Sequence, residues 1–218
     1  HEDVAPRKLS RTGHTSWTLA EVDFKRGPYL DQNTTGTTMT PSGTSGSVTI
    51  TASSNTFVST DVGRLIKFNG GHAKITNFSS ATQVTATTTD NFSGTGGTTD
   101  WSLGTFTSTK GFPRAVSFFE HRLVCAGTTS FPHTLFASES GLYEEFDVGS
   151  GNAADAFIYT IAANRVNVIR WLAPARDLIV GTVGGEFKVG RPTGEPLKPD
   201  NVQITQQTTN GGYTTQPI

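Results

Sequence analysis

Short segments in which apolar and polar residues alternate recur through the first half of the chain. The clearest are "SVTITAS" (47–53), "RLIKFNG" (64–70), "HAKITNF" (72–78), "TQVTATT" (82–88) and "DWSLGTF" (100–106). Successive side chains of a strand point to opposite faces, so this alternation indicates half-buried strands. Turn sequences such as "NGG", "NFSS" and "SGTGG" separate the segments. Residues 33–108 therefore predict a compact meander of about five strands, a small β-sandwich or barrel whose Thr-rich faces are solvated.

From residue 109 to residue 218 the apolar runs become stronger, and they occur in two similar sets. The first is "AVSFFEH" (115–121), "RLVCAGT" (122–128) and "TLFAS" (134–138), and the second is "VNVIRWLAPA" (166–175), "RDLIVGT" (176–182) and "EFKVG" (186–190). Gly127 and Gly181 occupy matching places, 54 residues apart. Self-similarity at this period, with several strands in each unit, is typical of β-propeller blades. Between the two sets, "NAADAFIYTIAANR" fits a helix, although "FIYTI" fits a strand equally well.

Residues 1–32 contain one strand candidate, "SWTLAEVDF" (16–24), in which Trp17, Leu19 and Phe24 lie among polar neighbours. The Gly27-Pro28 pair ends this segment, because proline removes a backbone donor and glycine permits a sharp bend. Upstream, three basic residues cluster at Arg7, Lys8 and Arg11. They form either a solvated face or a contact for phosphate or an acidic neighbour. We interpret 1–32 as a lead-in strand of the propeller part.

A turn with large aromatic residues follows the strand at 134–138. The strand ends at a Ser140-Gly141 pair, and two aromatic residues flank a pair of glutamates just beyond it. The prediction is a blade corner with a buried apolar group formed by Leu135, Phe136, Tyr143 and Phe146. The acidic residues Glu139, Glu144 and Glu145 are then expected to face water.

The composition supports strands and turns and excludes some partners. Only 16% of the 218 residues are charged, 24 are glycine, and the formal net charge is −1, which leaves no bulk basic surface for nucleic acid or membrane. The single Cys125 lies in an apolar run and is expected to be a small buried hydrophobe. No apolar run approaches the roughly 20 residues of a membrane-spanning helix. The chain begins at His1 without methionine, so we expect it to be a piece of a longer polypeptide.

The residues that chemistry would require do not form a recognisable set. Glu144 and Glu145 are adjacent, so on a strand they point to opposite faces and do not converge on one sugar as a glycosidase pair does. The glycine-containing "GTSGS" (43–47) and "GTVGGEF" (181–187) lack a following helix, and we interpret them as a loop and a hairpin. Histidines without metal-ligand spacing are expected to be surface or packing residues: His14, His72, His121, in a turn between two strands, and His133.

Two further binding hypotheses rest on scattered residues. Asp61, Asp90 and Asp100 are possible calcium ligands, but they lack the dense spacing of a calcium-binding loop. Trp101 and Tyr29 are single aromatics on which a sugar ring would stack. The sequence thus predicts no catalytic residue, no cofactor and no metal site, and it favours a protein that is not an enzyme.

Several segments together resemble the nozzle proteins of short-tailed bacteriophage tails, the tail tubular protein B family. They are "PRKLSRTGHTSWTL", "GPYLD", "FVSTDVGRLIKF" and "GFPRAVSFFEHRLVCAGT…PHTLFASESGLYEEF". The resemblance runs across nearly the whole chain and is most specific at 112–146, with "STDVGRLI" as a weaker marker. Family members are several times longer, so most of the blades are missing from this chain.

The resemblance implies an all-β fold, with propeller blade meanders interrupted by a small inserted Thr-rich β domain. It also implies a structural virion component, a ring of six copies in the tail through which DNA is ejected. The expected partners are further copies of the chain, adaptor and fibre proteins, and DNA in transient non-specific contact, with no membrane. A receptor- or carbohydrate-binding module of a phage tail is the alternative, and a polysaccharide hydrolase a third, which lacks its clustered acids or Ser/His/Asp set.

Overall fold

The computed structural model describes residues 3–149, 151–162 and 167–213, and its regular structure is almost entirely β. Within these residues there are sixteen strands and one short 3-10 helix, Ser59–Asp61, so the all-β prediction is confirmed. None of the described helical structure is long or apolar enough to cross a membrane. The chain divides into two units: unit 1 is His1–Phe24 with Lys110–Ile218, and unit 2 is Lys25–Thr109.

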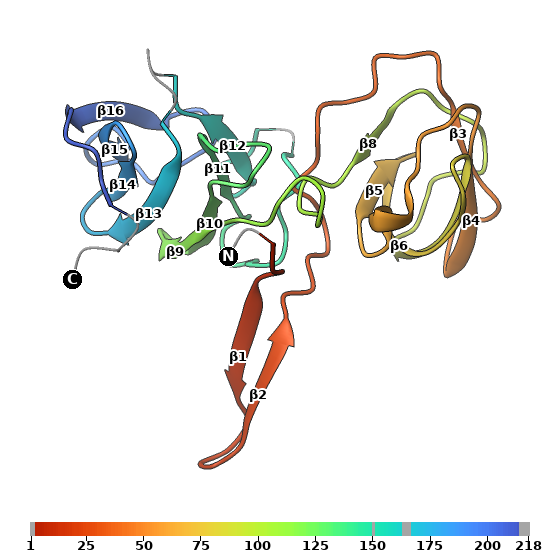
Figure 1. Cartoon of the computed structure of the whole chain (residues 1–218), viewed down its shortest axis with the longest axis horizontal. Coiled ribbons are helices and arrows are strands. Elements are labelled where there is room, and N and C mark those ends of the chain that lie inside the picture. Colours follow the sequence, from red (N-terminus) through yellow and green to blue (C-terminus); the bar gives the residue numbers. More distant parts are fainter. Residues whose placement is uncertain (1–2, 150, 163–166, 214–218) are drawn as a thin grey trace. The chain divides into compact units, whose positions relative to one another are not determined.

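Unit 2 contains one antiparallel sheet of six strands that curls into a half-barrel (Figure 1). In spatial order its strands are β3 (Met39–Pro41), β4 (Ser47–Ala52), β7 (Gln83–Asp90), β6 (Gly71–Ser80), β5 (Leu65–Phe68) and β8 (Trp101–Leu103). The expected five-strand meander is wrong in its order, because β4 pairs with the distant β7 instead of with β5. "NFSS" is also not a separator, since it lies within β6.

Alternation along these strands builds the core of unit 2. In β4 the side chains of Val48, Ile50 and Ala52 are buried, while the intervening threonines and serine face outward. Opposite them, β7 buries Val84 and Ala86, which pair with Ile50 and Val48. The remaining core residues come from the other strands and from the loops: Met39, Phe57, Ile66, Phe68, Ala73, Ile75, Phe92 and Leu103. One face of the curled sheet is therefore dry, and the Thr-rich face is solvated.

Unit 1 contains two four-stranded antiparallel sheets with the same strand order. The first comprises β9 (Ala115–Phe119), β10 (Arg122–Ala126), β11 (Thr134–Ala137) and β12 (Phe157–Thr160). The second comprises β13 (Ile169–Pro174), β14 (Leu178–Thr182), β15 (Gly185–Gly190) and β16 (Gln203–Thr208). The two similar sets seen in the sequence thus form the first three strands of each sheet, and "FIYT" is a strand. Residues 163–166, where the "VNVIRWLAPA" prediction begins, lie outside the described residues.

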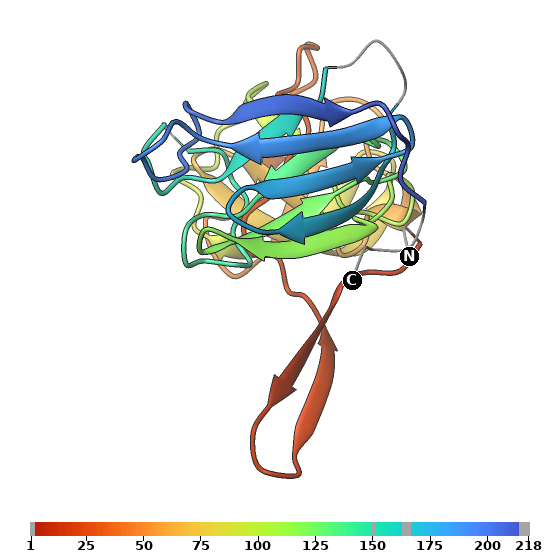
Figure 2. The ribbon, with the colours of Figure 1, turned by 90° about the vertical axis from the view of Figure 1, so that its left-hand side faces the viewer.

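One core is shared by the two sheets of unit 1. Strands β9 and β13, the first of each sheet, lie side by side. In Figure 2 the second sheet, drawn in blue, lies in front of the first. Val124 and Leu135 of the first sheet pack with Leu172, Val180 and Phe187 of the second in a single buried cluster. This arrangement leaves the fourth strands, β12 and β16, as edges that pair on one side only.

A β-hairpin of unit 1 precedes these sheets in the chain, formed by β1 (Arg7–Arg11) and β2 (Trp17–Glu21) (Figure 1). The sequence predicted β2 but not β1, whose residues were interpreted only as a basic cluster. Among the described strands, β1 and β2 pair with each other alone. Such a two-stranded ribbon is marginally stable by itself in water.

Candidate interaction surfaces

The corner after β11 is organised by one buried arginine. The guanidinium group of Arg122, a residue that is 1% exposed, donates hydrogen bonds to the backbone carbonyls of Ser138, Ala153, Ala154 and Asp155 at 2.6–3.1 Å. The same group lies over the ring of Phe157. Burial lowers the pKa of Arg122 from its ordinary value. These bonds tie the segment 138–155 to the start of β10 and give the corner a fixed shape.

The carboxylate of Asp155 completes this corner from within the loop. Its Oδ2 accepts hydrogen bonds from the backbone N–H groups of Gly151 and Asn152 at 2.9 and 2.8 Å. Meanwhile Ser138 donates its hydroxyl to the Glu139 carbonyl and accepts from the Leu123 N–H. The loop is therefore held by polar side chains at both of its ends.

The aromatic residues of the corner divide into one buried and one exposed member. Phe146 is 1% exposed and makes an edge contact with Phe24, with ring centroids 5.6 Å apart, so its predicted burial is confirmed together with that of Leu135 and Phe136. The prediction for Tyr143 is wrong, because this side chain is 42% exposed. It packs edge-on against Phe118, which is itself 62% exposed, at 5.1 Å between centroids.

The sequence suggested that the glutamates of the corner face water, but the structure places them partly inside the protein. Glu139, Glu144 and Glu145 are all half-buried, which corrects the expectation that they face water. Glu144 forms an ion pair with Lys8 of β1. The predicted turn at Ser140-Gly141 is confirmed, and Gly141 has a φ of +79° there.

Together, the exposed apolar side chains around this turn form a surface that we call the corner patch. Val116 and Phe118 lie two residues apart on β9 and share a face, and both are more than half exposed. Leu142 and Tyr143, from the turn, are 46% and 42% exposed. The segment 139–147 beside them carries four acidic residues and no basic one. The corner patch, defined as Val116, Phe118, Leu142 and Tyr143, is apolar with an acidic border.

The hairpin has two faces of different character. Leu9 pairs directly with Leu19 and Arg11 with Trp17, so these side chains share one face, which we call the hairpin face. Leu9, Trp17 and Leu19 are 62, 55 and 61% exposed, and the Arg11 guanidinium lies 5.6 Å from the centre of the Trp17 ring. The opposite face carries Lys8, which forms an ion pair with Glu144 in the turn after β11. The hairpin face is therefore apolar, with Arg11 and the Arg7–Glu21 ion pair at its border, and nothing among the described residues covers its large apolar side chains to below half exposure.

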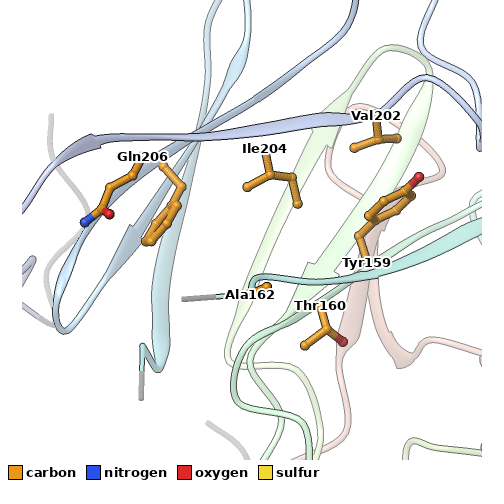
Figure 3. Close-up of a pocket in the computed structure, with 7 residues that line it drawn as sticks. Tyr159, Thr160, Ala162, Val202, Ile204 and Gln206 are labelled. Carbon is orange, nitrogen blue, oxygen red and sulfur yellow. The ribbon is translucent and has the colours of Figure 1, made fainter. Parts of the chain in front are cut away.

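A groove of about 390 Å³ lies between the edge strands of the two sheets of unit 1 (Figure 3). Tyr159 and Thr160 of β12 form one wall, and Ile204 and Gln206 of β16 form the other. Its floor is apolar because Phe187 and Val202 belong to the shared core or pack against it. The Tyr159 hydroxyl donates to the Pro199 carbonyl, so the tyrosine is fixed by the chain itself. No charged side chain lines the groove among the described residues.

The acidic residues considered for calcium are structural in this fold. Asp61 is 1% exposed and pairs with Arg64 at 2.8 Å, while its other oxygen accepts from the Val58 N–H. Asp90 accepts two hydrogen bonds from Arg26, which lower the pKa of Asp90 from its ordinary value of 3.8. Asp100 is exposed on a separate loop. No group of three potential metal ligands occurs in the part of the chain that the structure describes.

The two aromatics considered for sugar stacking are half-buried and used within unit 2. The Tyr29 hydroxyl is 2.6 Å from Nδ1 of His72, and the two rings stack. The indole Nε1 of Trp101 donates to the Thr37 carbonyl at 2.9 Å. His72 is only 7% exposed, as expected for a packing residue.

The remaining residues of the sequence predictions fall in ordinary structural places. His121 lies in the two-residue turn between β9 and β10 with a φ of +58°, as predicted, and His133 lies in the turn before β11. His14, at the exposed hairpin tip, contacts Arg11. "GTVGGEF" spans the β14–β15 hairpin and "GTSGS" a loop, which confirms both interpretations. Cys125 is 1% exposed, and burial raises the pKa of its thiol to about 12.

A scan of protein-family models gives no match to this chain, and a search of curated proteins finds no similar sequence.

Proposed function

We propose that this protein is a structural component of a short-tailed phage tail, a subunit of the ring-shaped nozzle through which DNA is ejected. Its two four-stranded sheets are consecutive propeller blades, and unit 2 is a β domain inserted into the propeller part. The protein works by assembly with copies of itself and with adaptor and fibre proteins. It carries out no chemistry.

The observation that carries this proposal is the pair of uncovered apolar surfaces on unit 1. The hairpin face and the corner patch together expose seven large apolar side chains by 42–62% each. Contiguous exposed apolar surface of this kind marks a site of protein–protein interaction. A subunit of an assembly requires such surfaces, whereas an enzyme requires converging polar groups in a pocket.

The blade interpretation is supported by the strand order of unit 1. Each sheet is a four-stranded antiparallel meander, and the first strands of consecutive sheets lie side by side. That is the arrangement of neighbouring propeller blades, whose first strands surround the central axis. The groove between β12 and β16 then corresponds to the place where two blades diverge toward their outer strands.

The test is to express the complete gene product and image it by electron microscopy. A ring of six copies is expected, with propeller-shaped density in each subunit. Genes for a portal and an adaptor protein are expected upstream. A monomer that releases reducing sugar from host-surface glycans would overturn the proposal, as would a trimeric fibre. The two residues considered for sugar stacking, Tyr29 and Trp101, do not favour the carbohydrate-binding alternative, because they are half-buried and bonded within unit 2.

A further inference from the structure

We propose that the hairpin face of one chain docks on the corner patch of a second copy, in a head-to-tail contact. This inference rests on the proposed function, because it identifies the surfaces through which the subunits of the assembly meet. The hairpin face is Leu9, Trp17 and Leu19 with Arg11, and the corner patch is Val116, Phe118, Leu142 and Tyr143.

The first reason is that the hairpin is not stabilised by its own chain on this face. Its two strands pair only with each other among the described residues, and three of its large apolar side chains are more than half exposed. A ribbon of two strands gains independent stability when a further layer covers its apolar face. The hairpin face therefore has the properties of half an interface.

The second reason is that the hairpin is held with this face turned away from its own corner. Lys8 and Leu9 are adjacent on β1, so their side chains point to opposite faces of the ribbon. Lys8 forms an ion pair with Glu144 of the same chain. The back of the hairpin is thus fixed to the corner, and the hairpin face is available to a different molecule.

The third reason is charge complementarity. On the hairpin face, Arg7 forms an ion pair with Glu21, and Arg11 beside Trp17 adds a further positive charge, while Lys8 lies on the opposite face. The border of the corner patch, residues 139–147, contains four acids and no base, and one of these acids, Glu144, is paired with Lys8 of the same chain. Each surface has an apolar centre and a border of opposite sign, which is the arrangement that favours specific association.

The same charges disfavour the symmetric alternative. If two hairpin faces met across a twofold axis, the Arg11 side chains of both copies would enter the same contact, whereas Arg7 is already paired with Glu21. Like charges brought together at an interface oppose association. Two different surfaces that fit each other instead give a heterologous contact, which closes into a ring when the rotation between copies permits it.

Disulfide trapping between two variants of the 218-residue chain tests this contact. Leu19→Cys and Phe118→Cys proteins are mixed under mild oxidation, and a disulfide-linked dimer containing one of each is expected. Both positions are exposed, so neither change disturbs a core. The native Cys125 is 1% exposed and does not compete. Thr18→Cys is the matched control, since it lies on the opposite face of the same strand and is expected to give a background yield.

A second measurement uses sedimentation of the unlinked chain. Leu19→Asp is expected to weaken self-association by about tenfold or more, as loss of a central interface residue does, whereas Thr18→Asp changes it by less than about twofold. The association of the native chain is expected to weaken as salt concentration rises, because the borders have opposite charge.

The outcomes separate this inference from the proposed function. A dominant Leu19→Cys homodimer would show a hairpin-to-hairpin contact and overturn the head-to-tail contact. Equal trapping by Thr18→Cys and Leu19→Cys would also overturn it, as would a chain that stays monomeric. If the complete gene product still forms rings in any of these cases, the proposed function stands and only the contact is wrong.

Discussion

Unit 1 and unit 2 are both antiparallel β structures, but they differ in how much apolar surface they leave uncovered. Among the described residues, thirteen large hydrophobic side chains are exposed, and eleven of them belong to unit 1. Unit 2 exposes only Val58 and Val62. Its single curled sheet encloses an apolar cluster drawn from all six strands. Unit 2 therefore buries nearly all of its large apolar side chains, whereas most of the exposed ones belong to unit 1.

The polar groups of the two units show the same difference. In unit 2, the buried Asp61–Arg64 pair closes a short turn, and the Arg64 Nε also donates to the Gly104 carbonyl. In unit 1, Arg122 donates hydrogen bonds that hold a long loop, and this loop carries Leu142 and Tyr143 of the corner patch. The buried ion pair of unit 2 thus stabilises the fold of unit 2 itself. In unit 1, the buried Arg122 instead fixes the conformation of a loop that has exposed apolar side chains.

The largest expected effect separates the buried and exposed aromatics of unit 1. Phe146→Ala is expected to lower the free energy of unfolding of unit 1 by about 3–5 kcal/mol, because a fully buried ring is replaced by a cavity. Tyr143→Ala is the matched control and costs about 1 kcal/mol or less, because its ring is 42% exposed. Hydrogen exchange measured by mass spectrometry reports the two units separately.

Protection in residues 25–109 is expected to stay unchanged in the Phe146→Ala variant. If unit 2 loses protection together with unit 1, the two do not unfold independently, and the comparison between them fails. If Tyr143→Ala is as damaging as Phe146→Ala, the corner patch is part of the core.

The sequence was a good guide where strands have one dry and one wet face. Alternating runs correctly indicated β4, β5, β6 and β7, and the repeated sets indicated the first three strands of each sheet in unit 1. Three strands were missed: β1, β3 and β16. Each is an edge strand that pairs on one side only. Edge strands are commonly polar, charged or interrupted by proline, as in "RKLSR", "MTP" and "QITQQT", so they carry little alternation.

The surfaces were less predictable than the strands. The pairing of β4 with β7 depends on contacts across more than 30 residues, which local patterns do not encode. Tyr143 and Phe146 look equivalent in the sequence, and only the path of the loop decides which ring turns inward. That path depends on Arg122, whose one local signal is a charged residue at the start of an apolar strand. The hairpin face could not be predicted either, because it is formed by β1 and β2 together and the sequence did not indicate β1.

An intermediate effect is expected from the turn that carries the corner patch. Gly141 has a φ of +79°, and a Cβ added there would meet no atom within 4 Å, so the cost of Gly141→Val is backbone strain alone. A left-handed conformation costs an L residue about 1–2 kcal/mol. Gly36→Val in unit 2 is the matched control, because Gly36 also has open space but no positive φ, and its change is expected within about 0.5 kcal/mol. Chemical denaturation with local exchange readout compares them.

Equal losses at the two glycines would show that the conformation of Gly141 is not required. A loss at Gly141 accompanied by weaker self-association would link the turn to the corner patch, since Leu142 and Tyr143 follow it directly.

The smallest effect is expected in unit 2, at the ion pair of Arg26 and Asp90. Hydrogen bonds from Arg26 lower the pKa of Asp90 from 3.8, with burial acting in the opposite direction and a smaller contribution from His72. Because the folded pKa lies below the unfolded one, the pair contributes stability above about pH 4, and this contribution is lost as pH falls through the folded pKa. The side chains are 41% and 34% exposed, so the contribution is about 0.5–1 kcal/mol at most.

Asp90→Asn is expected to be less stable than the native chain by this amount at pH 7, and the difference should shrink as the pH is lowered below 3.8. Asp100→Asn, at an exposed loop position of the same unit, is the control and should show little difference at either pH. If the difference in stability between Asp90→Asn and the native chain stayed the same at low pH, the charge of Asp90 would not be its cause. The stability of unit 2 would then depend on the packing of its core and not on this ion pair.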